Sequence, residues 1–253
     1  MKNLSIVLFI FLCFTCSSDD EGVFDGSTIE SLDEYVEFNS DSELDEVIAC
    51  AGGLDSGLFL DAPGTTSVIY YPIAGATEIR YFESETLLDS LDFSAYRSKD
   101  VQNSNLFNGF LAYFTPDSFE GERMAIVTFK TEGKLHISNP IRLKTNVKPT
   151  EINNDLLNLK VGGVNPSFSW QDGIIDETAI YFQVISDAND NFISGTYTFD
   201  KNFRFYELDN VVLNITQTTN PVLLPNEDYQ FTLMGVSEDN WVNLLIKQEF
   251  QTR

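Results

Sequence analysis

Short apolar runs, separated by clusters of Gly, Pro, Asn and Asp, follow one another from residue 47 to the C-terminus. Runs of this length between turn-forming residues are typical of β-strands. The aromatic content agrees, because 21 Phe and 10 Tyr against 3 Met favour strands over helices. We therefore predict an all-β fold. The expected strands cover 47–51, 67–72, 78–83, 110–114, 124–131, 134–138 and 141–145, and then 156–161, 167–170, 179–186, 193–199, 211–216, 229–236 and 241–252.

These strands form two sets whose ends match when the second set is moved back by 107 residues, so that Val127 meets Met234 and Gly133 meets Asn240. In both, alternating apolar strands flank an acidic residue followed by Gly or Asn, which indicates a β-hairpin. The stretch 146–150 interrupts the pattern and is typical of a linker. We predict two consecutive β-sandwiches, over 47–148 and 149–253, that end in the same kind of hairpin.

The charge of the chain excludes one class of partner and predicts a tether. With 15 Lys and Arg against 39 Asp and Glu, the formal net charge is −24, so nucleic acid is not an expected partner. The segment 17–46 holds twelve of the acidic residues and no Lys or Arg. Like charges repel and keep such segments solvated, so we predict that 16–46 is a flexible acidic tether.

The N-terminus has the features of an export signal. A short basic start precedes an apolar run over 4–14, and this run is too short to span a bilayer of roughly 30 Å. The two features together predict a signal peptide over 1–15. The small Thr15, then Cys16, two serines and an acidic cluster resemble the signal of Bacteroidetes-type surface lipoproteins. This resemblance implies that Cys16 carries palmitate and other acyl chains, which anchor the protein in the outer membrane and at the cell surface. The alternative is a secretory signal that leaves Cys16 free.

The second predicted sandwich carries a family resemblance. The sequence Asn-Pro-Ser-Phe-Ser-Trp at 165–170 is similar to an early strand of fibronectin type III domains, with its Pro and buried Trp. The sequence Leu-Pro-Asn-Glu-Asp-Tyr-Gln-Phe at 224–231 resembles the Leu-Pro turn and the Tyr of that family's penultimate strand. This resemblance covers 150–253 and implies an immunoglobulin-like sandwich. The first module shows a weaker likeness at 79–82 and 134–140 and has no Trp.

Residues that carry catalysis are scarce. His136 is the only His, and its place between Leu135 and Ile137 on an alternating strand predicts a side chain that faces solvent. A Ser-His-Asp triad or a typical zinc site would have to use it, so we predict no enzyme and no confident metal site. We interpret Cys50 as a buried, inert thiol in an apolar stretch.

Two sets of residues are candidates for ligand binding. The string 187–191 supplies Asp187, Asn189, Asp190 and Asn191, which match the calcium ligands of cadherin modules. The same residues suit a hairpin turn, which is the favoured interpretation, so calcium binding is the less favoured alternative. No other cofactor is expected. For glycan contact, the candidates are the aromatic residues Trp241, Tyr70 and Tyr71.

We therefore predict a non-catalytic, lipid-anchored cell-surface protein that acts as an interaction or accessory module of an outer-membrane assembly. Its expected partners are the outer membrane, through the N-terminal lipid, and a protein within that membrane. The alternative is a carbohydrate-binding surface lipoprotein that captures glycans. The sandwich fold itself does not decide between these functions.

Overall fold

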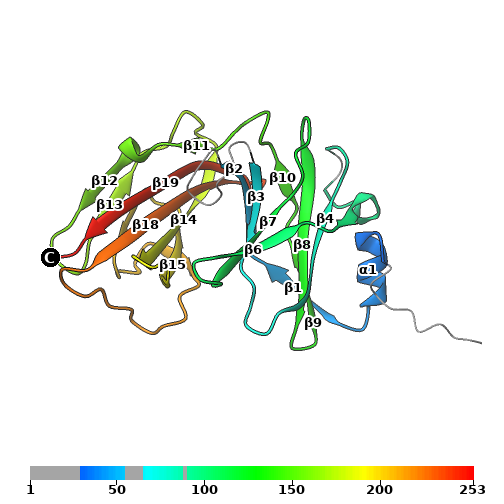
Figure 1. Ribbon diagram of the computed structural model, residues 1–253, viewed down its shortest axis with the longest axis horizontal. Helices are drawn as coiled ribbons and strands as arrows, with labels where there is room; N and C mark the ends of the chain where they lie inside the picture. The colour runs from blue at the N-terminus through cyan, green and yellow to red at the C-terminus, as the bar shows by residue number, and fades with distance from the viewer. Residues whose placement is uncertain (1–28, 55–64, 88–89) are drawn as a thin grey trace, which may run out of the picture.

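The computed structural model describes residues 29–54, 65–87 and 90–253, and it is all-β, as the sequence predicts (Figure 1). The strands of these residues form four sheets, which we call sheets A, B, C and D. Sheets A and B make up the first module, and sheets C and D make up the second. The signal peptide predicted at 1–15 and the lipidation site predicted at Cys16 lie outside the described residues.

The first module begins four residues before the predicted boundary, at Glu43, and its last strand ends at Leu143. Sheet A has the order β1-β9-β8-β4-β5, with β10 on β8, and consists of β1 (Glu43–Val47), β4 (Thr77–Glu83), β5 (Arg97–Lys99), β8 (Arg123–Thr131), β9 (Lys134–Ser138) and β10 (Ile141–Leu143). Sheet B has the order β2-β3-β7-β6 and consists of β2 (Ala49–Leu54), β3 (Thr65–Tyr70), β6 (Gln102–Leu106) and β7 (Leu111–Thr115). A 3-10 turn, η2 (Phe93–Ala95), precedes β5.

The second module runs from Glu151 to Gln251. Sheet C has the order β11-β19-β18-β14-β15-β17 and consists of β11 (Glu151–Ile152), β14 (Thr178–Asp187), β15 (Phe192–Thr198), β17 (Val211–Asn214), β18 (Asp228–Ser237) and β19 (Val242–Gln251). Sheet D has the order β12-β13-β16 and consists of β12 (Leu157–Lys160), β13 (Ser167–Trp170) and β16 (Asn202–Arg204), with the 3-10 turn η3 (Asn154–Leu156) before it.

The two modules repeat the same strand pairings. The hairpin β8–β9 pairs Thr128 with Ile137, and the hairpin β18–β19 pairs Gly235 with Leu244, so the register repeats at the predicted offset of 107 residues. Each module also begins with a strand that pairs in parallel with the second strand of this hairpin, β1 with β9 and β11 with β19. The predicted repeat of the hairpin is therefore confirmed.

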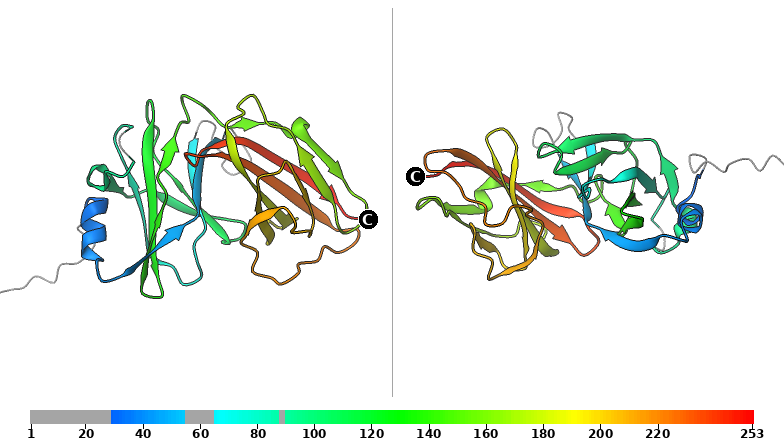
Figure 2. Two further views of the ribbon diagram at one scale, coloured as in Figure 1. Left: turned by 180° about the vertical axis from the view of Figure 1, so that it is seen from behind. Right: turned by 90° about the horizontal axis from the view of Figure 1, so that it is seen from below.

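Sheets A and B lie in the half of the molecule that carries helix α1, while β18 and β19 of sheet C run to the C-terminus at the other end, with β12 and β13 of sheet D beside them (Figures 1 and 2). Sheet B is covered by sheet A on one face and by sheet C on the other. Neighbouring residues of one strand therefore belong to different cores. In β3, Val68 packs in the core between sheets A and B, while Ile69 packs between sheets B and C. In β14, Phe182 faces sheet B and Tyr181 faces the core of the second module. Strands of a sheet that is covered on both faces are buried at successive residues, as 66–70 in β3 and 181–186 in β14 are.

The second half of the predicted tether is folded, which corrects that prediction. Helix α1 (Leu32–Phe38) lies on the outer face of sheet A, at the end of the stack (Figure 1). Ile29, Leu32 and Tyr35 are at most 4% exposed and pack with a cluster of sheet A and its surroundings that contains Phe82, Tyr96, Met124, Ile126 and Leu135. These three residues recur at a spacing of three, which places them on one face of the helical segment, while the acidic residues face water.

A hydrogen bond and the helix dipole stabilise the start of this helix. The Glu34 carboxylate accepts a hydrogen bond from the backbone N–H of Ser31 at 3.3 Å. Acidic side chains in the first turn also interact favourably with the helix dipole.

Among the described residues, no helix has the length and apolar character needed to span a membrane.

Candidate functional site

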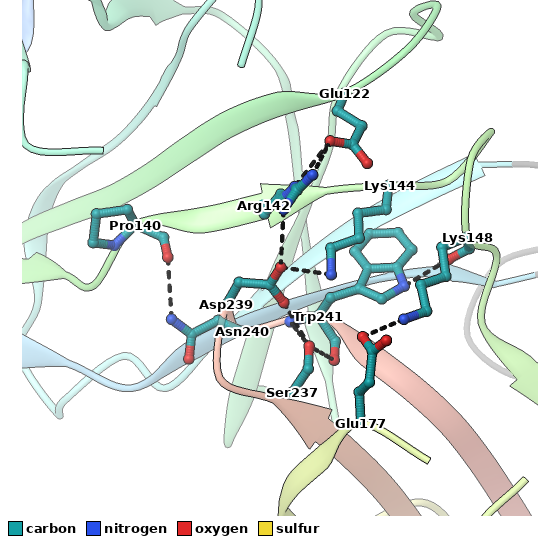
Figure 3. A network of polar contacts seen from close by, with 10 residues as sticks. All are labelled: Glu122, Pro140, Arg142, Lys144, Lys148, Glu177, Ser237, Asp239, Asn240 and Trp241. Atoms are coloured by element: carbon teal, nitrogen blue, oxygen red, sulfur yellow. Dashed lines mark hydrogen bonds and ion pairs between the residues drawn. The ribbon is translucent and has the colours of Figure 1, made fainter. Parts of the chain in front are cut away.

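A network of polar contacts lies where the two modules meet (Figure 3). It is built on the turn of the β18–β19 hairpin, 237–241, which we call the junction turn. This turn leaves the second module and enters the first. Trp241 is 0% exposed and belongs to the core between sheets A and B, where it contacts residues of the first module. The junction turn therefore contributes the largest side chain of its neighbour's core.

Backbone hydrogen bonds hold the junction turn in the first module. Residues Ala51 and Trp241 form an isolated parallel bridge, and the Ala51 N–H donates to the Asn240 carbonyl at 2.9 Å. The Arg142 N–H donates to the Asp239 carbonyl at 3.0 Å. The turn thus behaves as a short extra strand beside β2, although it belongs to the other module.

Side chains complete this attachment. The indole Nε1 of Trp241 donates to the Lys148 carbonyl at 2.8 Å, and the Asn240 amide donates to the Pro140 carbonyl at 3.1 Å (Figure 3). Within the turn, the Ser237 hydroxyl donates to the Asp239 carboxylate at 2.6 Å. An asparagine with φ of 60° at position 240 closes the turn, a conformation that Asn adopts more readily than most residues.

The junction turn is also held by charge. The Asp239 carboxylate lies 2.5 Å from Nζ of Lys144 and 3.8 Å from the Arg142 guanidinium, which also pairs with Glu122. Burial opposes ionisation of Asp239, but the hydrogen bonds from Lys144 and Ser237 outweigh it and hold the pKa below its ordinary value. The Lys144 side chain is only 7% exposed, so loss of its partner would leave a desolvated charge.

An apolar contact surrounds this polar attachment. The outer faces of sheets B and C share one core cluster, in which Ile69, Phe107, Leu111 and Tyr113 of the first module meet Phe182, Val184, Ile215, Met234, Val236, Val242 and Leu245 of the second. Two domains joined by a free linker share no such core. We conclude that the two modules form one packed body.

The predicted linker is part of the same body. Thr150 is buried, donates to the Val242 carbonyl at 2.7 Å and accepts from the Gly53 N–H at 3.1 Å. Lys148 forms an ion pair with Glu177 of the second module. The segment 144–150 therefore connects the modules under tight packing.

Two of the three residues predicted for glycan contact are inaccessible. Trp241 is 0% exposed and Tyr70 is 1% exposed, and both lie in the core between sheets A and B. Both predictions are wrong, because Tyr70 lies in a strand that is covered on both faces and Trp241 enters the core of the first module from the junction turn. Tyr71 is half-buried at the edge of the junction and stacks on Phe110, with ring centroids 5.1 Å apart.

The string 187–191 forms the turn of the β14–β15 hairpin. One oxygen of the Asp187 carboxylate accepts from the backbone N–H groups of Asn189 and Asn191 at 2.8 and 2.9 Å, and the other accepts from the Asn191 amide at 2.8 Å. Desolvation opposes these hydrogen bonds, which nevertheless hold the pKa of Asp187 below its ordinary value. Asp190 has a φ of 59° within this turn. Among the described residues, no group of three or more His, Cys, Asp and Glu is placed to hold a metal ion.

His136 does not face solvent, which corrects the prediction. It is 2% exposed and stacks on its cross-strand neighbour Phe129, with ring centroids 4.7 Å apart. Both faces of sheet A are covered, since Leu135 packs in the cluster beneath helix α1. Neither ring nitrogen has a hydrogen-bond partner among the described residues. His136 is therefore a buried residue of sheet A.

Cys50 lies at the junction, where it lines a small apolar cavity of about 80 Å³ with Ile69, Leu111 and Phe182. Burial raises the pKa of its thiol to about 12, so the thiol stays protonated at neutral pH. A protonated thiol is a poor nucleophile. This environment gives Cys50 a packing role.

Comparisons with known proteins give similarity to solved structures but to no sequence family. No family model matches the chain, and no curated protein matches it. Among solved structures, the chain is similar to the chicken CNTN1 FN1-FN3 domains, with a TM-score of 0.30 and 12% sequence identity, over 84% of this chain and 68% of that chain. The strand order and register described above, rather than this similarity, define the fold.

Proposed function

We propose that the chain is a non-catalytic binding protein, anchored in the outer membrane by a lipid on Cys16 and exposed at the cell surface as an accessory module of an outer-membrane assembly. The observation that carries this proposal is the junction, in which Trp241 of one module completes the core of the other. Such a body holds surfaces of both modules in a fixed relation, which favours recognition of a partner without a large loss of conformational entropy.

The proposed anchor rests on the signal sequence and on the charge of the segment that follows it. Several acyl chains on one terminus anchor a protein stably, whereas a single chain does not. The acidic residues between Cys16 and helix α1 are repelled by an anionic lipid surface, so they favour a folded body held away from the membrane.

Protease treatment of intact cells tests the anchor and its orientation. We expect the protease to remove both modules and to leave a membrane-bound N-terminal fragment whose Cys16 is acylated, as mass spectrometry would show. In a Cys16→Ala variant, the chain should leave the membrane fraction. Modules that stay intact on whole cells, or a Cys16→Ala variant that remains in the membrane, would contradict the proposal.

Mild detergent extraction tests the accessory role. We expect the wild-type chain to elute from a sizing column in a complex larger than its own 28.5 kDa, together with an outer-membrane protein in fixed stoichiometry. A chain that elutes alone in detergents that preserve known outer-membrane complexes would contradict this part of the proposal.

A further inference from the structure

A groove of about 410 Å³ opens at the edge of the junction. Both modules line it. Tyr71, Pro72 and Ala74 follow β3, residues 107–110 form the turn between β6 and β7, and Asn191, Phe192 and Gln217 come from the second module. Its volume lies within the range of small-ligand sites. The groove depends on the junction, because neither module could form it alone.

The lining of this groove has no carboxylate, ammonium or guanidinium group. In contrast, a second hollow is lined by Asp187, Asp190, Asp228 and Glu249, and a third is lined by Asp176, Glu177, Glu238 and Asp239. On a chain with a formal net charge of −24, an uncharged groove selects for an uncharged ligand.

Aromatic rings provide a fixed platform in the groove. Phe192 stacks on Phe110 with centroids 3.4 Å apart, and Phe110 stacks on Tyr71 with centroids 5.1 Å apart. Phe110 is the only ring that Tyr71 contacts among the described residues. Tyr71 is half-buried and lines the groove, and its stack on Phe110 holds the ring in place.

Side-chain amides lie beside this platform. The Gln217 amide donates to the Tyr71 hydroxyl at 3.1 Å, and the Asn108 amide donates to Asn191 Oδ1 at 2.7 Å and to the Asn189 carbonyl at 3.0 Å. Within the described part of the chain, the carbonyl oxygens of the Gln217 and Asn108 side chains accept no hydrogen bond. Both residues are exposed, so these oxygens are available to hydroxyl donors.

We infer that this groove binds a neutral carbohydrate. One face of a neutral sugar ring is rich in C–H groups and stacks on aromatic rings, while its hydroxyls pair with amides. The groove offers Tyr71 for the first contact and the amides of Asn108 and Gln217 for the second. The site deepens the proposed binding role by naming its ligand class. It does not depend on the membrane anchor, since the purified chain would carry it.

Native gel electrophoresis with soluble polysaccharides provides the first test. The probes are the neutral polymers β-glucan, xyloglucan, galactomannan, arabinoxylan and dextran, with the acidic polymers alginate and polygalacturonate for comparison. We expect at least one neutral polymer, and neither acidic polymer, to retard the purified chain. Retardation by none of the neutral polymers, or stronger retardation by an acidic one, would overturn the inference.

Matched variants then locate the site by titration calorimetry with a hexasaccharide of the retarding polymer. Tyr71→Ala should lower the affinity about tenfold, equivalent to about 1.4 kcal/mol, and Gln217→Ala should weaken it to a smaller extent. Phe199→Ala removes another ring, 65% exposed and outside the groove lining, and should leave the affinity unchanged. Thermal melting shows that each variant is folded. Wild-type affinity in Tyr71→Ala, or equal losses in Tyr71→Ala and Phe199→Ala, would overturn the inference.

Discussion

Replacement of Trp241 by Ala should destabilise the whole protein and separate its two modules. The side chain is fully buried, and removal of a buried Trp or Phe typically costs about 3–5 kcal/mol. Its Nε1 donates to the Lys148 carbonyl, and the loss of that bond adds about 1 kcal/mol. With about 2–4 °C of Tm for each kcal/mol, a loss of about 5 kcal/mol lowers the Tm by about 10–20 °C.

Calorimetry distinguishes this effect from ordinary core damage. The wild type should unfold in a single transition because the modules share a core, whereas Trp241→Ala should unfold in two. Trp170→Ala is the matched control, since Trp170 is 4% exposed and packs only in the core of the second module. It should lower the stability by a similar amount without separating the modules. A Trp241→Ala variant that loses less than about 1 kcal/mol, or that keeps one transition, would refute the coupling.

Three further predictions concern helix α1, the junction turn and the thiol. Leu32→Ala should lower the free energy of unfolding in urea by about 2–5 kcal/mol, while the exposed Glu37→Ala changes it by about 0.5 kcal/mol or less; equal effects would mean that the helix is not packed. The pKa of Asp239 lies below its ordinary value of 3.8 in the folded protein, so its stabilisation is present above that pH and is lost as the pH falls through the folded pKa. The gap in unfolding free energy between wild type and Asp239→Asn should therefore stay constant from neutral pH to about pH 5 and close at lower pH; a constant gap throughout would contradict this. Cys50, with a pKa of about 12, should react with a disulfide reagent at pH 8 about a thousandfold more slowly in the native than in the unfolded chain, as peptide mass mapping would measure; similar rates would show that the thiol is exposed.

The sequence predicts the fold class, the two modules and the register of their last hairpins, because these depend on local signals. Turn-forming residues and short apolar runs mark strands directly, and the acidic residue followed by Gly or Asn marks each hairpin. The prediction of a flexible tether fails at residues 29–46, because charge dominates that segment. The signal that identifies the helix is the spacing of Ile29, Leu32 and Tyr35 between the acidic residues.

The candidate site is harder to predict, because the alternation of residues along a strand predicts exposure only where one face of the sheet is exposed to solvent. On that assumption, His136 is predicted to face solvent and Tyr70 to contact a glycan. Both are buried, because their sheets are covered on both sides. Trp241 follows a turn, where exposure is the usual expectation, and nothing local indicates that a neighbouring module receives it. Contacts between modules join residues far apart in the sequence, which periodicity does not report.

The parallel pairing of β1 with β9 and of β11 with β19 has a mechanical consequence. Helix α1 and the C-terminus lie at opposite ends of the long axis (Figure 1). A force that pulls β1 against β9, or β11 against β19, acts along the strands of that pair. In this geometry all hydrogen bonds between the two strands are strained together. In contrast, antiparallel strands that are pulled apart from one end lose their hydrogen bonds one after another. Each of these two parallel pairs would therefore resist such a force better than a hairpin that is opened from one end.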